Sequence, residues 1–184
     1  MIFPVVIYGA PVLRKVAQDI PKDMEGLEQF VSDMWETMYV SDGVGLAAPQ
    51  VGRSLRLFVI DGTPMSEDDT SVEGFKKTFI NAKIVERKGD NVIMGEGCLS
   101  IPTIREEVDR PHEIRIQYYD EQWNFHDEWF TGIAARIVQH EYDHLEGILF
   151  TDHLSPLRKR LLKGKLAGIA KGKFNVDYRF KLAK

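Results

Sequence analysis

Two histidines and a glutamate stand at a spacing that suits the binding of a metal ion. Residues 139–147 read Gln-His-Glu-Tyr-Asp-His-Leu-Glu-Gly, which separates His140 from His144 by four positions and places Glu141 between them. On a helix, side chains four residues apart lie on one face, so both imidazoles can bind a single ion. Glu141 then lies near the open coordination position, where a carboxylate can accept a proton from water. The pattern predicts a catalytic metal site.

The residues before this motif predict that the two histidines face the interior. Ile133, Ile137, His140 and His144 fall at positions i, i+4, i+7 and i+11, which form one stripe of a helix. We expect this helix over residues 131–145. Because the histidines continue an apolar, inward face, and because buried polar side chains need partners, a surface role for the pair is disfavoured.

A third protein ligand must come from elsewhere in the chain, because a tetrahedral catalytic metal takes three protein ligands and keeps one open position. The place where one class of zinc peptidases has a third histidine is occupied by Phe150, and no glutamate follows Glu146. The remaining candidates are Asp152, His153 and Cys98. Their positions in the sequence leave this choice open.

Cys98 is the only cysteine of the chain. A lone cysteine cannot form an internal disulfide, and by itself it is most often a small buried apolar residue. It lies, however, in the segment Gly-Glu-Gly-Cys-Leu-Ser at residues 95–100, where the flanking glycines allow close approach of the backbone. A thiolate with two imidazoles is a good ligand set for Fe(II) or Zn(II).

A third segment, residues 43–50, reads Gly-Val-Gly-Leu-Ala-Ala-Pro-Gln and by itself would be an ordinary loop. Together with Glu-Gly-Cys-Leu-Ser and Gln-His-Glu-x-Asp-His-Leu-x-Gly, in this order, it closely resembles the three signature motifs of the bacterial-type peptide deformylases. The resemblance spans residues 4–154.

This resemblance implies a metal-dependent hydrolase. The expected reaction removes the formyl group from the N-terminal formylmethionine of newly synthesised polypeptides and releases formate. Cys98, His140 and His144 take the role of metal ligands, and Glu141 becomes the base that activates water together with the metal. Fe(II) is the metal that the resemblance favours for the cell, while a purified sample can hold Zn(II) or another divalent ion.

The resemblance also assigns residues that contact the substrate. The side-chain amide of Gln50 and the backbone N–H of Leu99 are the expected donors to the formyl oxygen, where charge develops during the reaction. Glu96 and Arg105 match charged family positions beside the cysteine, which leaves a supporting salt bridge between them open. Residues expected to bind the substrate backbone or its methionine side chain are Val44, Gly45, Gly97 and Ile137.

Two other classes of protein remain as alternatives. A generic zinc peptidase would use His140 and His144 with Asp152 or His153, and would cut unformylated peptides internally. A non-catalytic ribosome-binding protein would hold a purely structural metal. Glu141 argues against the second alternative, as does Gln50, because a structural site needs neither.

Composition limits the remaining possibilities. The chain has 184 residues, of which 43% are hydrophobic, enough for one globular domain with a full core. We expect residues 1–154 to form the catalytic region and residues 155–184 a basic helix and tail of the same domain. One free cysteine suits a reducing compartment, and neither a signal peptide nor a membrane span is expected, so we predict a cytoplasmic protein without membrane or DNA partners.

Charge is distributed unevenly along the chain. The formal net charge is −4, yet residues 155–184 contain ten Lys and Arg residues and a single Asp. A solvated terminal helix, beginning at Ser155-Pro156, is the simpler interpretation. The functional interpretation is contact with the RNA-rich surface of the ribosome, where a C-terminal helix of some bacterial deformylases docks.

Periodicity predicts the remaining elements. A helix is expected over residues 24–40, with Asp23 as its N-cap, followed by a strand at 55–60 and a mobile acidic loop at 61–74. Further strands are expected at 78–85, 91–94, 105–108, 114–119 and 123–129, with turns at 87–90 and 120–122 and Gly147 as the cap that ends the metal-binding helix. Strands in runs with separate helices indicate an α+β fold. The resemblance implies antiparallel or mixed sheets around a central metal-binding helix, with N-terminal and C-terminal helices.

Overall fold

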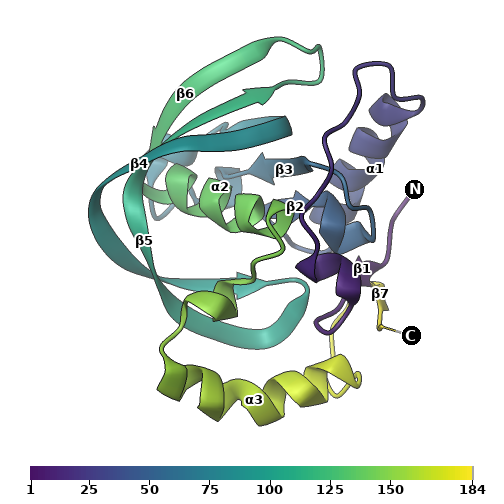
Figure 1. Ribbon diagram of the computed structural model, residues 1–184, viewed down its shortest axis with the longest axis vertical. Helices are drawn as coiled ribbons and strands as arrows, with labels where there is room; N and C mark the ends of the chain where they lie inside the picture. Colours follow the sequence, from purple (N-terminus) through teal and green to yellow (C-terminus); the bar gives the residue numbers. More distant parts are fainter. Residues whose placement is uncertain (184) are drawn as a thin grey trace.

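A five-stranded antiparallel sheet curves around one central helix, α2 (Gly132–Leu145), in the computed structural model, which describes residues 1–183 (Figure 1). The strands follow one another in space in the order β2 (Gly45–Ala47), β3 (Leu57–Asp61), β4 (Lys76–Cys98), β5 (Ile101–Tyr119) and β6 (Phe125–Thr131). A separate pair of short strands, β1 (Val5–Val6) and β7 (Phe180–Lys181), is parallel. The expected α+β class with mixed sheets around a central helix is confirmed.

Helix α2 begins and ends where the sequence predicts. Thr131 is still extended, and the helix starts at Gly132. Gly147 adopts a φ of 69°, and a β-carbon there would stand 2.7 Å from the backbone of Arg14. Only glycine combines this backbone angle with so close an approach, so the helix ends here. Its apolar side packs into a core that includes Phe58, Phe79, Tyr118, Ile133 and Ile137.

Strands β4 and β5 form one long hairpin, and the expected turn at residues 87–90 is wrong. Lys88 pairs with Glu113 and Asn91 with Pro111, so the chain does not reverse between them. The register shifts at this point, and Gly89 has a φ of 79°. The left-handed glycine therefore serves a bulge, which bends the strand, and not a reverse turn.

The expected strands at 105–108 and 114–119 are two parts of the single strand β5. Pro111 lies between them and cannot donate a ladder hydrogen bond. The strand tolerates it because Pro111 lies beside the register shift, and because β6 pairs with β5 only from Glu113 onward. The predicted turn at 120–122 does connect β5 to β6.

Helix α1 (Leu27–Val40) begins three residues later than expected, with Gly26 and not Asp23 at its N-cap. Gly26 has a φ of 75°, so the chain turns sharply before the first helical residue. The acidic loop contains two short 3-10 helices, Thr63–Met65 and Thr70–Val72. Val72 is fully buried, so part of this loop packs on the core; its mobility stays a prediction.

The C-terminal region forms helix α3 (Pro156–Ala170), as the sequence predicts. Ser155 accepts a hydrogen bond from the Arg158 N–H at 3.3 Å, and Leu162 and Ile169 are buried against the body. The tail then returns to β1, which brings the two termini to the same side of the molecule (Figure 1). The remaining helical turns are Pro11–Arg14, Ala48–Val51 and Phe150–His153.

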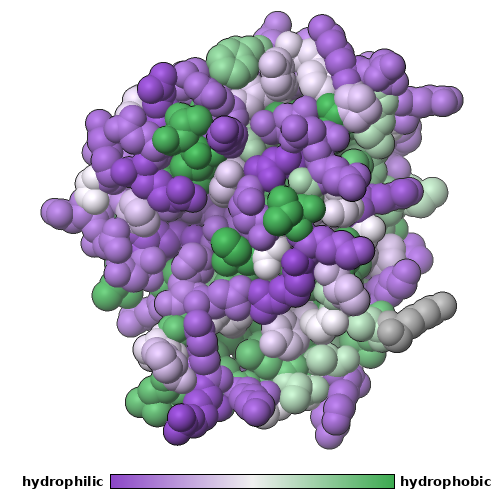
Figure 2. Space-filling view, in the orientation of Figure 1, coloured by the Kyte–Doolittle hydropathy of each residue, from purple (hydrophilic) through white to green (hydrophobic). Residues whose placement is uncertain are grey.

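The face of the molecule seen in Figure 2 is mainly hydrophilic, with hydrophobic side chains scattered across it. Within residues 1–183, no helix has both the length and the apolar character needed to cross a membrane.

Candidate metal centre

Three donor atoms converge at one end of the β4–β5 hairpin. Cys98 stands at the last residue of β4, and His140 and His144 lie on the facing side of α2. One ligand atom from each of the three lies within 4.8 Å of the other two. The Cys98 sulfur and Nε2 of His144 are 3.4 Å apart. The structure thus brings the three predicted ligands together across more than forty residues of sequence.

The two alternative third ligands point elsewhere. The Asp152 carboxylate accepts hydrogen bonds from the Arg14 guanidinium at 2.5 Å and from the Leu149 N–H at 2.8 Å. His153 lies 2.7 Å from the carboxylate of Asp143. Within residues 1–183, Cys98 with the two α2 histidines is the one group of three such donors close enough to share an ion.

Local geometry explains how Cys98 is presented. It pairs with Ile101, so Leu99 and Ser100 form the tip of a tight hairpin. The tip is attached to the N-terminal segment, because the N–H of Tyr8 donates to the Ser100 carbonyl at 2.8 Å. A side chain at the end of a paired strand is held more rigidly than one in a free loop.

The surroundings of Cys98 favour its thiolate form. Burial opposes the charged form, but the nearby imidazoles of His144 and His140 outweigh it and lower the pKa of the Cys98 thiol to about 5. The pKa of His140 is raised well above its usual value, since contacts with Cys98 and Glu96 overcome its burial. A thiolate is the form of cysteine that binds metals.

A buried ionic network orients His140. Its Nδ1 atom lies 2.8 Å from Oε2 of Glu96, which leaves Nε2 for the metal side. Glu96 in turn accepts hydrogen bonds from Arg110 at 2.6 and 3.0 Å and from Arg136 at 3.0 Å. Although burial favours its neutral form, contacts with His140 and Arg110 hold the pKa of Glu96 well below its usual range.

The salt bridge between Glu96 and Arg105 that the sequence left open does not form, since Glu96 pairs with Arg110, Arg136 and His140. Arg105 pairs in register with Gly97 and directs its guanidinium to the carbonyl of Gly95 at 3.4 Å. Glu96 and Gly97 are neighbours in one strand, so their side-chain positions lie on opposite faces of the hairpin. The partners of Glu96 come from inside the molecule. Arg110 and Arg136 escaped the sequence analysis, because no local spacing connects them to residue 96.

Glu141 is buried beside the donors, and its carboxylate can accept a further hydrogen bond. Its Oε2 atom has no hydrogen-bond partner among the described residues. Burial raises the pKa of Glu141 to about 7, with the two neighbouring histidines opposing the shift. A carboxyl group that exchanges its proton near neutral pH is suited to general acid–base catalysis.

Gln50 is locked in one orientation. Its Oε1 atom accepts a hydrogen bond from the Ala47 N–H at 2.9 Å. The amide NH₂ therefore points to the centre, 3.4 Å from the Cys98 sulfur and 3.3 Å from the hydroxyl of Ser100. This donor lies beside the candidate ligand Cys98, and Ser100 is a neighbour that the sequence did not indicate.

A cavity of about 590 Å³ opens over these groups. It is lined by every residue that the sequence analysis assigned to the substrate: Val44, Gly45, Gly97 and Ile137. Gln50, Leu99 and Glu141 also line it. Met65 reaches it from the acidic loop, and Val176 and Tyr178 reach it from the C-terminal tail, where we expected no contribution to the site.

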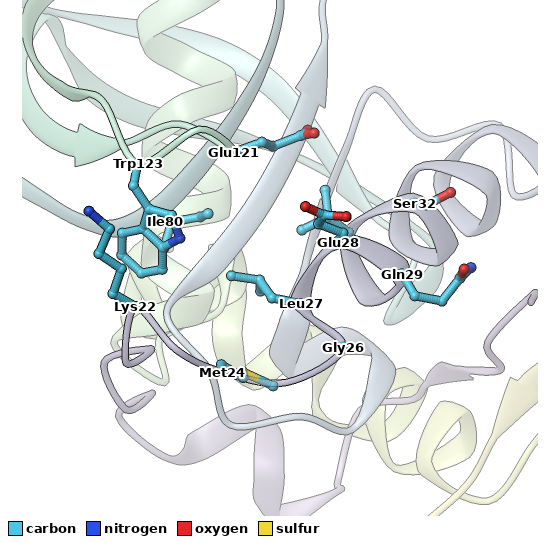
Figure 3. A pocket seen from close by; sticks show the side chains of 11 residues that line it. Lys22, Met24, Gly26, Leu27, Glu28, Gln29, Ser32, Ile80, Glu121 and Trp123 are labelled. Atoms are coloured by element: carbon cyan, nitrogen blue, oxygen red, sulfur yellow. The ribbon is translucent and has the colours of Figure 1, made fainter.

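A larger cavity, of about 710 Å³, lies between the start of α1 and the β5–β6 turn (Figure 3). Leu27, Ile80 and Trp123 contribute to its wall, together with the charged side chains of Lys22, Glu28 and Glu121. No cysteine or histidine lines it. The candidate chemistry therefore belongs to the smaller cavity.

The three donors beside the smaller cavity fit a divalent metal ion. One thiolate sulfur and two imidazole nitrogens supply three ligands of the types that Fe(II) and Zn(II) prefer. The unpartnered oxygen of Glu141 lies buried beside them, where a water on the fourth position would give it a partner.

The chain is similar to known proteins over most of its length. The family model described as polypeptide deformylase matches residues 2–160. The peptide deformylase of Christiangramia forsetii is 53% identical over 98% of this chain and 96% of its own length. That of Cytophaga hutchinsonii is 54% identical over 98% of this chain and 97% of its own length.

Solved structures show the same fold. The peptide deformylase of Thermus thermophilus superposes with a TM-score of 0.81 at 40% identity, covering 93% of this chain and 97% of that one. A Plasmodium falciparum peptide deformylase in complex with an inhibitor gives a TM-score of 0.79 at 35% identity, covering 91% of this chain and 99% of that one.

Proposed function

The chain belongs to the polypeptide deformylase family, and from this membership we propose that Cys98, His140 and His144 hold the metal on which its reaction depends. The family reaction removes the N-formyl group from nascent peptides by metal-dependent hydrolysis. The observation that carries the proposal is the convergence of the three donors within 4.8 Å, beside an unpartnered Glu141.

We propose Fe(II) as the metal in the cell, with Zn(II) or another divalent ion able to replace it in purified protein. The sulfur and nitrogen ligand set suits both. When bound, such an ion lowers the pKa of a coordinated water and makes a nucleophile available near neutral pH.

Glu141 is the proposed proton carrier. In its ionised form it accepts the proton from the attacking water, and it then delivers this proton to the leaving amine. A pKa near 7 lets the same carboxyl group serve in both steps, since neither direction of transfer is strongly uphill. The products are formate and a free N-terminus.

Gln50 and Leu99 are the proposed donors to the formyl oxygen. The Gln50 amide is fixed before substrate arrives, because the Ala47 N–H holds its oxygen. Leu99 lies at the hairpin tip next to the cysteine, where its N–H can face the same oxygen. Donors that need no rearrangement stabilise charge as it develops on the substrate.

The substrate backbone is proposed to add to the sheet as a further strand. Strand β2, which contains Gly45, is at the edge of the sheet and pairs only with β3 among the described strands. An extended peptide can use this free edge for main-chain hydrogen bonds. Val44 and Ile137 would then surround the methionine side chain, and Gly97 would form the opposite wall.

The decisive experiment measures formate release from an N-formyl-methionyl tripeptide under anaerobic conditions with Fe(II). The matched control is the same tripeptide with an N-acetyl group. We expect formate from the first and no hydrolysis of the second. Internal cleavage of unformylated peptides, without formate release, would favour the generic zinc peptidase instead.

We further propose that residues 1–154 form the catalytic region, that residues 155–184 belong to the same domain, and that the protein works in the cytoplasm. Helix α3 exposes basic side chains, and Leu157 and Leu161 beside them are 66% and 63% exposed. This surface supports a proposed contact with the ribosome near emerging formylated chains.

Deleting the whole C-terminal region is a poor test of that contact, because Leu162 and Ile169 are part of the core. Exchanging the exposed residues Lys159, Arg160 and Lys163 for Glu keeps the helix. We expect ribosome cosedimentation to fall and its salt dependence to flatten. The control exchanges three exposed cations elsewhere, Lys22, Lys83 and Arg87. Equal binding by both triple variants would remove the proposal.

A further inference from the structure

The C-terminal tail after α3 runs as an extended segment along the body. From Phe174 to Arg179, half-buried and exposed residues alternate, with Phe174, Val176 and Tyr178 on the inner side. This alternation has the period of a strand. The sequence of this segment also alternates between apolar and polar residues, within a region of high positive charge.

The N-terminal segment ties this tail to the hairpin tip that carries Cys98. The N–H groups of Val5 and Ile7 donate to the carbonyls of Arg179 and Lys181 at 2.8 and 3.0 Å. The next residue, Tyr8, donates its N–H to the Ser100 carbonyl. The tail is therefore fixed at a defined distance from the active site, although it lies about eighty residues away in the sequence.

Tyr178 makes direct contact with the hairpin tip. Its hydroxyl donates to the backbone carbonyl of Leu99 with an oxygen–oxygen distance of 2.7 Å. Its ring lines the cavity over the metal ligands. Burial, with a smaller contribution from the Cys98 charge, raises the pKa of Tyr178 to about 12, so the hydroxyl keeps its proton at physiological pH.

Leu99 is the residue whose N–H is the proposed donor to the formyl oxygen. At the tip of a two-residue hairpin, the peptide planes on either side of Leu99 are the least restrained by strand pairing. A hydrogen bond to its carbonyl limits rotation of the residue, and with it the direction of its N–H. Oxyanion donors act by being held in place before the charge develops.

We propose that Tyr178 is a positioning residue for deformylation, holding the Leu99 carbonyl so that the Leu99 N–H faces the substrate oxygen. This inference rests on the proposed function. It makes the C-terminal tail part of the catalytic apparatus, although the tail contributes no group to the chemical step.

The test compares Tyr178→Phe, which removes one hydroxyl, with Tyr118→Phe as a matched control. The hydroxyl of Tyr118 also donates a short hydrogen bond, to Glu128 at 2.5 Å, and it accepts one from Lys77 at 3.3 Å, but it lies outside the cavity over the metal ligands. For Tyr178→Phe we expect kcat to fall about tenfold with KM within twofold of wild type, because misplacing an oxyanion donor weakens only the transition state. For Tyr118→Phe we expect wild-type kcat.

A second measurement is independent of turnover. The backbone amide resonance of Leu99, and its rate of hydrogen exchange, should change in Tyr178→Phe and stay as in wild type in Tyr118→Phe. A wild-type kcat in Tyr178→Phe, a loss confined to KM, or an unaltered Leu99 amide would each overturn the role of Tyr178. An inactive wild-type enzyme loaded with Fe(II) would instead overturn the proposed function, so the two failures are distinguishable.

Discussion

Gly45 and Glu141 lie in direct contact: a β-carbon added at Gly45 would stand 2.5 Å from Oε1 and 2.7 Å from the carboxyl carbon of Glu141. Any side chain at position 45 would therefore displace the proposed catalytic carboxyl group. The edge strand that is proposed to receive the substrate and the base that acts on it thus share one boundary. The edge strand and the carboxyl group can keep their positions only because residue 45 has no β-carbon.

Gly45→Ala is expected to lower kcat by roughly a hundredfold, since a displacement of about 1 Å at a reacting group can cost that much. Metal content should not change, because none of the three ligands is touched. The control is Gly164→Ala on α3, where nothing lies within 4 Å of the added carbon and activity should be unchanged. Steady-state kinetics with the formylated tripeptide decide the point, and a fully active Gly45→Ala enzyme would contradict it.

Cys98→Ala is expected to abolish formate release and to weaken metal binding, because it removes one of three ligands. Metal analysis after dialysis, together with the formate assay, measures both. Asp152→Asn is the comparison, since its carboxylate is bound by Arg14 and the Leu149 N–H and should not matter to the metal. If Cys98→Ala kept one equivalent of metal and released formate, Asp152 or His153 would become the third ligand.

Glu141→Gln is expected to reduce kcat by about 10²–10⁴-fold, the usual contribution of a general acid–base group, while metal binding persists. The wild-type enzyme should lose activity as the pH falls through the pKa of Glu141, which burial raises above its usual value, because only the ionised form accepts a proton. A pH profile of kcat/KM checks this. If the loss of activity at low pH persisted in Glu141→Gln, a group other than Glu141 would be responsible for it.

The same substitution should stabilise the metal-free protein at alkaline pH. The folded carboxyl group titrates near 7 and an unperturbed one at 4.5, so between these values the folded chain holds a proton that the unfolded chain has released. Stability therefore falls as the pH rises through this window, by roughly 3 kcal/mol in total. Urea unfolding should show Glu141→Gln more stable than wild type at pH 8 and similar to it at pH 5. If wild type were the more stable protein at pH 8, the buried charge of Glu141 would be stabilised by neighbouring groups.

Arg110→Met is expected to destabilise the fold by about 3–5 kcal/mol, because it removes the one cation that pairs with both buried carboxylates, Glu96 and Asp143. Arg115→Met is a matched control, as Arg115 also makes a two-bond contact with one carboxylate, Asp127, but its side chain is 41% exposed. That loss should be under about 1 kcal/mol. Denaturant midpoints measure both, and equal losses would contradict the importance of burial.

Local patterns in the sequence were sufficient for the elements that carry chemistry. A spacing of four places two histidines on one face of a helix whatever surrounds it, and an apolar stripe tells which face is inward. The length of α2 and the role of Gly147 at its end followed from the same local rules. The three motifs, taken together, identified the family, and that resemblance led to Cys98 as the proposed third ligand.

Pairing between distant segments could not be predicted from local patterns. Gly89 reads as a turn because a left-handed glycine is common in turns, yet the same conformation also suits a bulge, and only the register of β4 against β5 decides between them. Arg105 was connected with Glu96 because both match charged family positions beside the cysteine. Because side chains alternate along a strand, these two residues lie on opposite faces of the hairpin.

The sequence by itself determined the fold class, the family and the side chains that perform the proposed chemistry, because these depend on short-range periodicity and on contiguous motifs. Only the tertiary structure decided which residues hold those side chains in place. Arg110 and Arg136 orient His140 through Glu96, and Tyr178 reaches Leu99 from the far end of the chain. Such contacts join residues that share no period in the sequence, and they exist only once strand register and the path of the tail are set.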